Sequence, residues 1–272
     1  MNKELIDKIN HIYWKYTTGK QIVTTSQHLA VLTSMCSFGK NVNRGPIAVA
    51  KSLLNNEEIT LIMLGGTQIK EGQATGFKES KLSAYGKDND YLIALLNLFK
   101  SKDKDGKYII PKDKPLLITG ISLGGMIAQQ LLSKEEIKNN YQIKSIICFG
   151  SPLVKPLDRK NIRVKRFCDR GDIVPKMETI SVKLNKSKKA LDKEEKIIED
   201  GGYKTKIESH ALSYVSNKCW DKYDFYGDKK DTNTLELLEE IKFYDAPVIA
   251  KKNNNGNSNL NIIWHNRRNF KL

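Results

Sequence analysis

The sequence predicts an α/β fold in which helices cover both faces of a mainly parallel central sheet. Apolar runs of strand length alternate along the middle of the chain with segments whose apolar residues recur at helical spacing. The runs are apolar at consecutive positions, which is typical of strands buried on both faces. Strands that are joined through helices pair in parallel, because the crossover returns the chain to the same end of the sheet.

Helical spacing of apolar residues opens the chain. It extends over residues 5–16 and returns over residues 29–36, and a third helix is expected over residues 46–53, with Pro at its first position. The period changes at residues 59–64, a β-branched apolar run that ends at two glycines. This run predicts the first core strand.

Three more core strands are expected in the middle of the chain, at residues 115–119, 143–149 and 162–167. Apolar residues at helical spacing predict a helix over residues 91–99, before the first of these strands, and another over residues 127–132, after it. This alternation of helix and strand is the basis for the predicted fold class.

Towards the C-terminus the apolar pattern weakens. Residues 183–206 carry many charges of both signs and indicate a solvated excursion. A short helix is expected after His210, and a longer one over residues 235–241. The end of the chain is rich in Asn and Lys and has no acidic residue. We predict one domain over residues 1–245, followed by a basic extension over residues 246–272.

The charge balance limits the choice of partners. Lys and Arg number 46 against 31 Asp and Glu, a formal net charge of +15. Such a surface attracts anions, so an anionic membrane, nucleic acid or an acidic protein is expected, and a solvated surface with no specific partner is the alternative. The stretches 155–166 and 251–271 are the most basic and are candidates for lipid contact. No recognised nucleic-acid motif accompanies the charge.

The location of the protein follows from features that the chain lacks. No run approaches the roughly 18 apolar residues that cross a bilayer, and the first residues are charged where a secretion signal needs an apolar stretch. The four cysteines have no metal-ligand spacing and are expected to be buried free thiols. We expect a cytoplasmic protein, or one exported without a cleavable signal peptide.

The segment 120–125 reads Gly-Ile-Ser-Leu-Gly-Gly and fits the G-x-S-x-G pattern of a nucleophile elbow. It follows a predicted buried strand and precedes a predicted helix, as that turn requires. The glycines two positions on either side of Ser122 leave room for a strained backbone. A Walker phosphate loop would need Lys and then Ser or Thr after its last glycine, whereas Met126 follows here. We therefore predict that Ser122 is a nucleophile.

Backbone donors for a developing oxyanion are expected on two sides of Ser122. The amide of Leu123 lies at the start of the helix that follows the elbow. The turn Gly65-Gly66-Thr67 ends the first core strand, and the Thr67 amide, with its hydroxyl as a second donor, would point at a substrate carbonyl oxygen. An ordinary glycine turn is the alternative for this segment.

An acid and a base are also expected after the sheet strands. Asp172, in the loop after the fourth strand, is the clearest candidate for the acid, with Asp169 as its rival, and a turn or cap role is the alternative for either. His210 follows the acid, as the hydrolase order Ser, Asp, His requires. His265 also follows but lies beyond the Asn-rich stretch, and the other two histidines precede the first strand. A surface histidine is the alternative for both.

Five segments of the chain each match a sequence motif of one protein family, in the same order along the chain. They are Leu64–Thr67, Leu116–Gly125, Ile146–Pro152, Arg166–Pro175 and His210–Tyr214. They are similar, in turn, to the F-R-G-T turn, the apolar strand with G-H-S-L-G-G, the F-G-S/A-P strand end, the R…D-x-V-P segment and the H-x-x-x-Y of one family. The chain thus resembles, over residues 59–215, the class 3 lipases, which include fungal triacylglycerol lipases and plant phospholipases A1.

The resemblance implies an α/β-hydrolase fold with a catalytic triad and neither metal nor cofactor. The triad would be Ser122, Asp172 and His210, with the amides of Thr67 and Leu123 as the oxyanion hole. The chain departs from the family in two places. Isoleucine replaces the His before the nucleophile, and glycine replaces the Arg of the oxyanion turn. Both departures leave the substrate preference open.

The leading hypothesis is a serine ester hydrolase that acts on acyl lipids, either as a phospholipase A or as an acylglycerol lipase. A soluble carboxylesterase, and a catalytically inactive module that binds lipid or protein, are the alternatives. Residues 68–88 follow the oxyanion turn, where the family carries a mobile cover, and Phe77, Leu82 and Tyr85 would meet lipid there. A plain surface loop is the alternative for this segment.

Overall fold

The computed structural model describes residues 22–37, 45–68, 73–154, 162–177, 196–203, 205–216 and 219–249. The helix expected over residues 5–16, most of the charged excursion and His265 lie outside the described residues. The predicted domain boundary at residue 245 stays a prediction. Residues just beyond it contact the body of the protein, since the Ala246 amide donates to the side chain of Gln73 at 2.8 Å.

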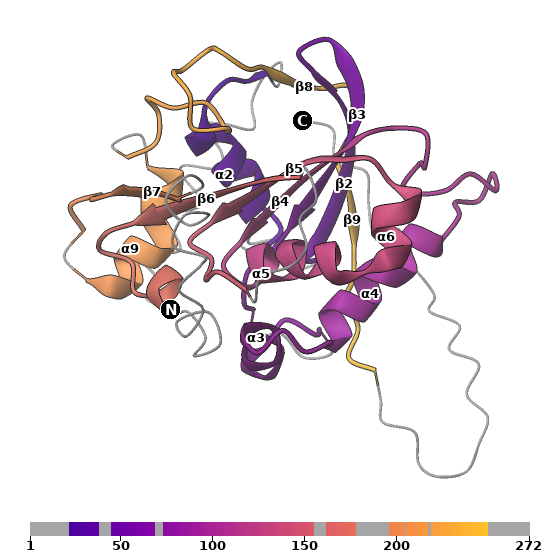
Figure 1. The fold of residues 1–272 in the computed structure, drawn as a ribbon, viewed down its shortest axis with the longest axis horizontal. Helices are drawn as coiled ribbons and strands as arrows, with labels where there is room; N and C mark the ends of the chain where they lie inside the picture. The colour runs from indigo at the N-terminus through magenta and orange to yellow at the C-terminus, as the bar shows by residue number, and fades with distance from the viewer. Residues whose placement is uncertain are drawn as a thin grey trace.

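Among the described residues, nine strands form one sheet in the order β1-β8-β2-β3-β4-β5-β6-β7, and β9 also pairs with β2 (Figure 1). The strands are β1 (Ile22–Val23), β2 (Ile47–Leu54), β3 (Glu57–Leu64), β4 (Leu116–Ile121), β5 (Ile143–Phe149), β6 (Arg163–Asp169), β7 (Lys196–Glu199), β8 (Leu235–Leu237) and β9 (Lys242–Tyr244). All four core strands expected from the sequence are therefore confirmed, with small shifts at their ends.

The sheet is mixed, and the prediction of a mainly parallel sheet is correct for only part of it. Strands β3 to β7 pair in parallel. Strand β2 is antiparallel to β3, β8 and β9, and β1 is antiparallel to β8. The difference arises because β2 and β3 are joined by a short hairpin turn rather than by a helix.

The prediction of a helix over residues 46–53 is wrong, because this segment forms β2. Strands β2 and β3 flank Asn55 and Asn56, whose φ angles are 49° and 68°. Two consecutive residues of positive φ form the type I′ turn that closes two-residue hairpins, and Asn adopts this conformation readily. The Asn pair that resembles a helix stop is therefore a hairpin turn.

The helix expected over residues 235–241 is also wrong. Its residues contribute β8, and β9 follows it; both strands lie along the edge of β2. Without them, β2 would present a row of unpaired backbone donors and acceptors. Pairing with a strand far away in the sequence thus overrides the helical spacing of the apolar residues.

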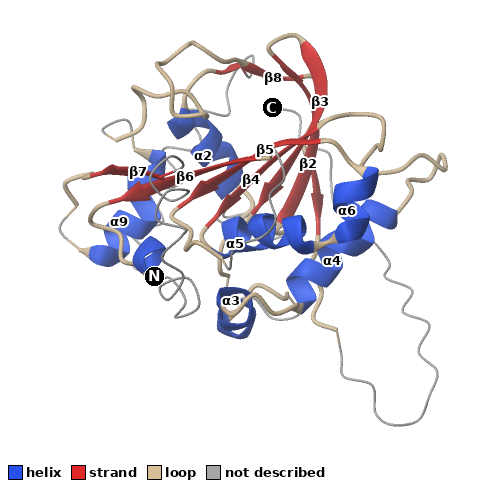
Figure 2. Ribbon diagram, in the orientation of Figure 1, coloured by secondary structure: helices blue, strands red, loops and turns tan. Residues whose placement is uncertain are grey.

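Helices pack on both faces of the sheet, as predicted (Figure 2). They are α2 (Ser26–Ser34), α3 (Phe77–Ala84), α4 (Asp90–Lys100), α5 (Leu123–Gln130), α6 (Glu135–Asn140) and α9 (Lys206–Leu212). In β3, Leu61 and Met63 belong to the apolar core on the α2 side, and Ile62 and Leu64 belong to the core beneath α4 and α5. The strand is buried on both faces, which explains its continuous apolar run.

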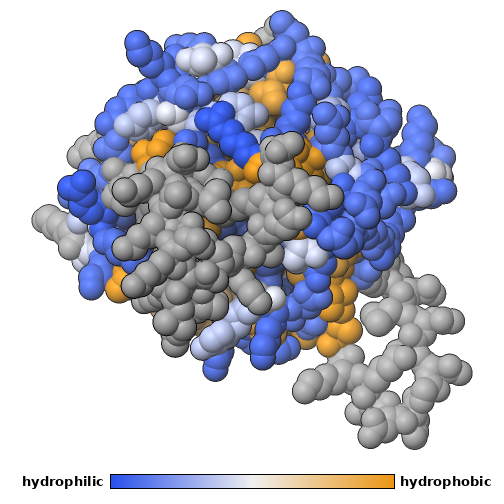
Figure 3. Space-filling view, viewed as in Figure 1, coloured by the Kyte–Doolittle hydropathy of each residue, from blue (hydrophilic) through white to orange (hydrophobic). Residues whose placement is uncertain are grey.

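The surface agrees with the composition. Hydrophilic residues cover most of the described surface in Figure 3, with smaller apolar areas between them. No helix in the described part of the chain has both the length and the apolarity that crossing a membrane requires. All four cysteines are buried and none of them is in a disulfide, as predicted.

Candidate active site

Ser122 occupies the sharp turn between β4 and α5. Its φ and ψ are 52° and −119°, a region that non-glycine residues avoid and that persists only where the surroundings enforce it. A Cβ atom on Gly120 would lie 2.4 Å from the carbonyl carbon of Gly124, and one on Gly124 would lie 2.2 Å from the Leu64 oxygen. No side chain fits at either position, so the pattern of glycines around Ser122 has a steric cause.

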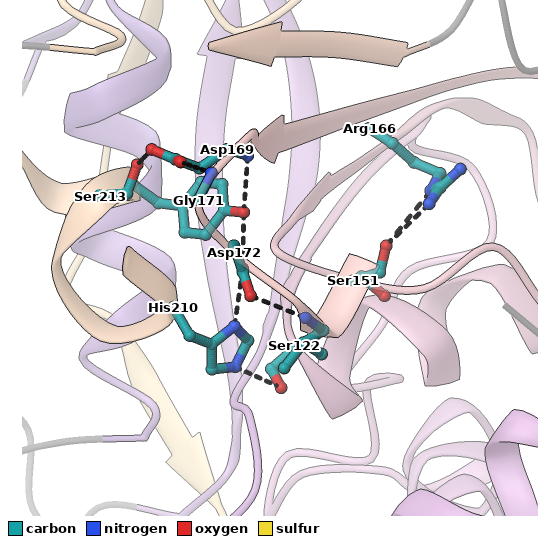
Figure 4. A network of polar contacts seen from close by, with 10 residues as sticks. Ser122, Ser151, Arg166, Asp169, Gly171, Asp172, His210 and Ser213 are labelled. Atoms are coloured by element: carbon teal, nitrogen blue, oxygen red, sulfur yellow. Dashed lines mark hydrogen bonds and ion pairs between the residues drawn. The ribbon is translucent and has the colours of Figure 1, made fainter. Parts of the chain in front are cut away.

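His210 lies between Ser122 and Asp172 (Figure 4). Its Nε2 is 3.0 Å from the Ser122 Oγ, and its Nδ1 is 2.8 Å from the Asp172 Oδ2. The histidine projects from α9, whose start is capped by the Thr205 side chain. The three residues come from three segments far apart in the sequence and meet at the carboxyl ends of β4 and β6.

Asp172 is completely buried and both of its carboxylate oxygens accept hydrogen bonds. The Val174 amide donates to Oδ1 at 2.8 Å, and the Tyr214 hydroxyl donates to Oδ2 at 2.8 Å. Because Oδ2 is an acceptor, the facing Nδ1 of His210 carries the proton. The Nε2 of the neutral imidazole is then free to accept a proton from Ser122.

Asp169, the rival candidate for the acid, has other partners. It receives hydrogen bonds from the Gly171 amide at 2.6 Å, from the Gly201 amide at 2.8 Å and from the Ser213 hydroxyl. These contacts join the acid loop to the turn at residue 201 and to the segment that follows α9. Asp169 thus holds together the two segments that carry Asp172 and His210.

Tyr214 connects the two carboxylates. Its hydroxyl accepts from the Asp169 amide at 3.0 Å and donates to the Asp172 Oδ2. Its ring stacks on Trp220 with centroids 5.9 Å apart. Burial, with the nearby Asp172 charge, raises the pKa of Tyr214 well above its usual value, so the phenol remains a donor. Tyr214 is part of the H-x-x-x-Y segment that resembles the lipase family, but the sequence does not predict its hydrogen bond to Asp172.

The predicted oxyanion turn lies against the elbow. A Cβ atom on Gly66 would lie 3.1 Å from the Cβ of Ser122. The Gly66 amide already donates to the hydroxyl of Ser37, at the end of α2. Among the described residues, the amides of Thr67 and Leu123 have no acceptor. Both amides are therefore available to a substrate oxygen, and their role as the oxyanion hole stays a prediction.

The Thr67 hydroxyl has a partner that the sequence does not predict. Ser80 Oγ donates to the Gly76 oxygen at 3.1 Å, so its 2.9 Å contact with Thr67 Oγ1 requires Thr67 to be the donor. In this structure the hydroxyl thus has Ser80 as its partner, and its expected part in binding the oxyanion stays a prediction. It ties the turn to α3, the helix formed by part of the segment that the sequence indicates as a cover.

The described end of the basic stretch 155–166 is buried in part, although Arg163 is exposed. Arg166 is buried in β6 and its guanidinium donates to the Ser151 oxygen at 3.1 and 3.3 Å. Lys165 is also buried. These two residues cannot contact lipid, because the strand turns them into the protein. Residues 155–161 and 251–271 lie outside the described residues.

Comparisons with known proteins give little further information. No protein-family model and no curated protein matches the sequence. Among solved structures the chain is similar to Lip2 lipase from Yarrowia lipolytica, with 14% identity over 65% of this chain and 75% of that chain. The TM-score of 0.26 is too low to carry an argument.

Proposed function

We propose that this protein is a serine hydrolase of the α/β-hydrolase fold that cleaves carboxylic esters of lipids, as a phospholipase A or an acylglycerol lipase. One observation carries the proposal. The atoms Ser122 Oγ, His210 Nε2, His210 Nδ1 and Asp172 Oδ2 follow one another at hydrogen-bond distances of 3.0 and 2.8 Å, with the serine in a strained turn.

The first half of the reaction forms an acyl-enzyme. Ser122 Oγ attacks the ester carbonyl while His210 Nε2 takes its proton. The carbonyl oxygen becomes an oxyanion that accepts hydrogen bonds from the amides of Thr67 and Leu123. When the tetrahedral intermediate collapses, His210 returns the proton to the leaving alcohol and the acyl group stays on Ser122.

The second half repeats these steps with water. His210 removes a proton from a water molecule that attacks the acyl-enzyme, and the collapse releases a fatty acid and regenerates Ser122. Asp172 stabilises the positive charge that His210 carries in both halves and holds the imidazole in the required tautomer. A single oxyanion donor accounts for about 10²–10³-fold in kcat in enzymes of this type.

The lipid class is supported by the sequence rather than by the triad, which would cleave any accessible ester. The resemblance to class 3 lipases and the net charge of +15 favour a substrate presented at an anionic interface. A soluble carboxylesterase would use the same residues. A catalytically inactive binding module would keep the fold without an activated Ser122.

The test is product analysis by mass spectrometry on mixed phospholipid and glyceride vesicles, with a soluble nitrophenyl ester assayed in parallel. We expect free fatty acid from the vesicles and turnover of both substrates, and Ser122→Ala should lower both rates by roughly 10³-fold or more. Turnover of the soluble ester alone would indicate a carboxylesterase. Unchanged hydrolysis by Ser122→Ala would contradict the mechanism.

A further inference from the structure

The large apolar side chains that are most exposed in the described part of the chain lie on the elements that build the active site. Phe77 and Ile207 are each 73% exposed, Met177 is 62% exposed and Tyr85 is 60% exposed. Large apolar residues exposed to this extent are unfavourable in water unless another surface covers them.

Each of these side chains belongs to a segment with a role at the site. Phe77 begins α3, which the Thr67 hydroxyl ties to the oxyanion turn, and Tyr85 ends it. Met177 closes the short helical turn that follows the acid loop. Ile207 lies one helical turn before His210 on α9. In Figure 1, α9 lies to the left of the N-terminal end of α5 and α3 lies below it, so these helices flank the Ser122 turn.

The exposed apolar residues at the opposite end of the sheet differ from this group. Leu238 is 42% exposed and lies beside the strand end of β2 that is farther from Ser122, where its amide donates to the Lys51 oxygen. Tyr108 has the ammonium groups of Lys102 and Lys112 over its ring, each 5.1 Å from the centroid. These residues supply natural controls.

Basic residues stand directly beside the apolar ones. Lys78 follows Phe77, Lys176 precedes Met177 and Lys206 precedes Ile207. Acidic groups offset part of this charge, since Lys78 lies 3.7 Å from Glu79 and 3.9 Å from Asp90. On α9, the half-buried Glu208 follows Lys206 two residues later. Apolar side chains with neighbouring ammonium groups match the interface of a bilayer that contains anionic lipid.

We propose that Phe77, Tyr85, Met177 and Ile207, with their neighbouring lysines, form a docking face that seats the protein on an anionic bilayer with the Ser122 site towards the lipid. The biological use of this face rests on the proposed function, but binding itself needs no catalysis. Apolar side chains enter the interface, and the lysines contact anionic headgroups, each strengthening binding by roughly fivefold.

Binding is measured by sedimentation of the Ser122→Ala variant with sucrose-loaded vesicles, so that no lipid is consumed. The vesicles are phosphatidylcholine with or without phosphatidylglycerol. We expect binding that requires phosphatidylglycerol and falls with added salt, since headgroup attraction is screened. Equal binding to neutral vesicles, or no binding to either, would overturn the proposal.

Variants locate the face. Phe77→Ser combined with Ile207→Ser should weaken binding by about 100-fold, because two large apolar side chains leave the interface, whereas Leu238→Ser should leave it unchanged. Circular dichroism and thermal unfolding verify that each variant is folded. If the double variant does not fold, the single Phe77→Ser variant replaces it in the binding measurement. If Leu238→Ser weakens binding as much as the face variants, the proposed face is wrong.

A charge comparison completes the test. Lys206→Ala should weaken binding by roughly fivefold, and Lys104→Ala, in the loop at the far end of the sheet, should not weaken it. The proposed function has a separate readout, hydrolysis of a soluble ester by the protein with Ser122 intact. Failure of vesicle binding with normal soluble-ester turnover would overturn the docking face alone.

Discussion

The substitution Asp172→Asn tests which carboxylate is the acid. It preserves the shape of the side chain but converts one accepting oxygen into a donor. Both oxygens accept in the structure, since Oδ2 faces His210 and Tyr214 and Oδ1 faces the Val174 amide, all at 2.8 Å. In either orientation the new amide therefore places a donor against a donor.

The expected magnitude follows from the tautomer. An NH2 group facing Nδ1 of His210 requires that nitrogen to be an acceptor, which moves the proton to Nε2 and removes the base from Ser122. The loss in kcat should be about 10⁴-fold, equivalent to roughly 5 kcal/mol of transition-state stabilisation. The mispaired buried donor should also lower the free energy of unfolding by about 1–3 kcal/mol.

Asp169→Asn is the matched control. Its carboxylate is also buried and also accepts from backbone amides, at Gly171 and Gly201. It should lower the free energy of unfolding by a similar amount, but kcat by less than about tenfold. The assay measures kcat and KM on a soluble nitrophenyl ester and urea unfolding on the same preparations. Retention of kcat by Asp172→Asn, or a 10⁴-fold loss confined to Asp169→Asn, would refute the assignment.

Three other predictions concern the elbow, the tyrosine and a buried histidine. Gly124→Ala should lower the unfolding free energy by at least about 2 kcal/mol, because its Cβ would lie 2.2 Å from a backbone oxygen of β3, whereas Gly106→Ala, in open space at φ 77°, should lose only about 1 kcal/mol. Comparable losses would contradict the steric account. Tyr214→Phe should lower kcat about tenfold with little change in KM, because the acid loses a donor; wild-type kcat would exclude this role. Burial lowers the pKa of His28 from 6.5 to about 4. The unfolded chain then binds a proton at higher pH than the folded one. The stability that the protein has with His28 neutral is therefore complete above pH 6.5 and is lost as the pH falls towards 4. The unfolding free energy should be about 2 kcal/mol lower at about pH 5 than at neutral pH, and His28→Gln should remove that difference in urea titrations.

The core of the fold could be predicted because its strands are buried on both faces. The runs in β3, β4 and β5 are continuous and apolar, and no helix pattern competes with them. Strand β2 was harder to predict because the Asn pair that follows it is compatible with either a helix end or a hairpin turn. Strand β8 lies in a segment with helical spacing of apolar residues, and its pairing with β2 makes it a strand.

The geometry of the site could be anticipated in part. The positions of Ser122 and His210 follow from local motifs and chain order, and the structure brings them together with Asp172. The contact between Thr67 and Ser80 could not be predicted, because it depends on where α3 packs. The same is true of Asp169, whose partners come from segments that only the folded chain brings together.

The most direct test of the account is labelling with a fluorophosphonate, which reacts with activated serines. We expect one phosphonate adduct by intact mass, located on Ser122 by peptide mapping, and loss of ester hydrolysis in proportion to labelling. His210→Ala should slow the labelling by roughly 10³-fold or more, because the base is removed. Absence of an adduct on Ser122, or equal labelling of His210→Ala, would contradict the claim that these residues form a nucleophile and its base.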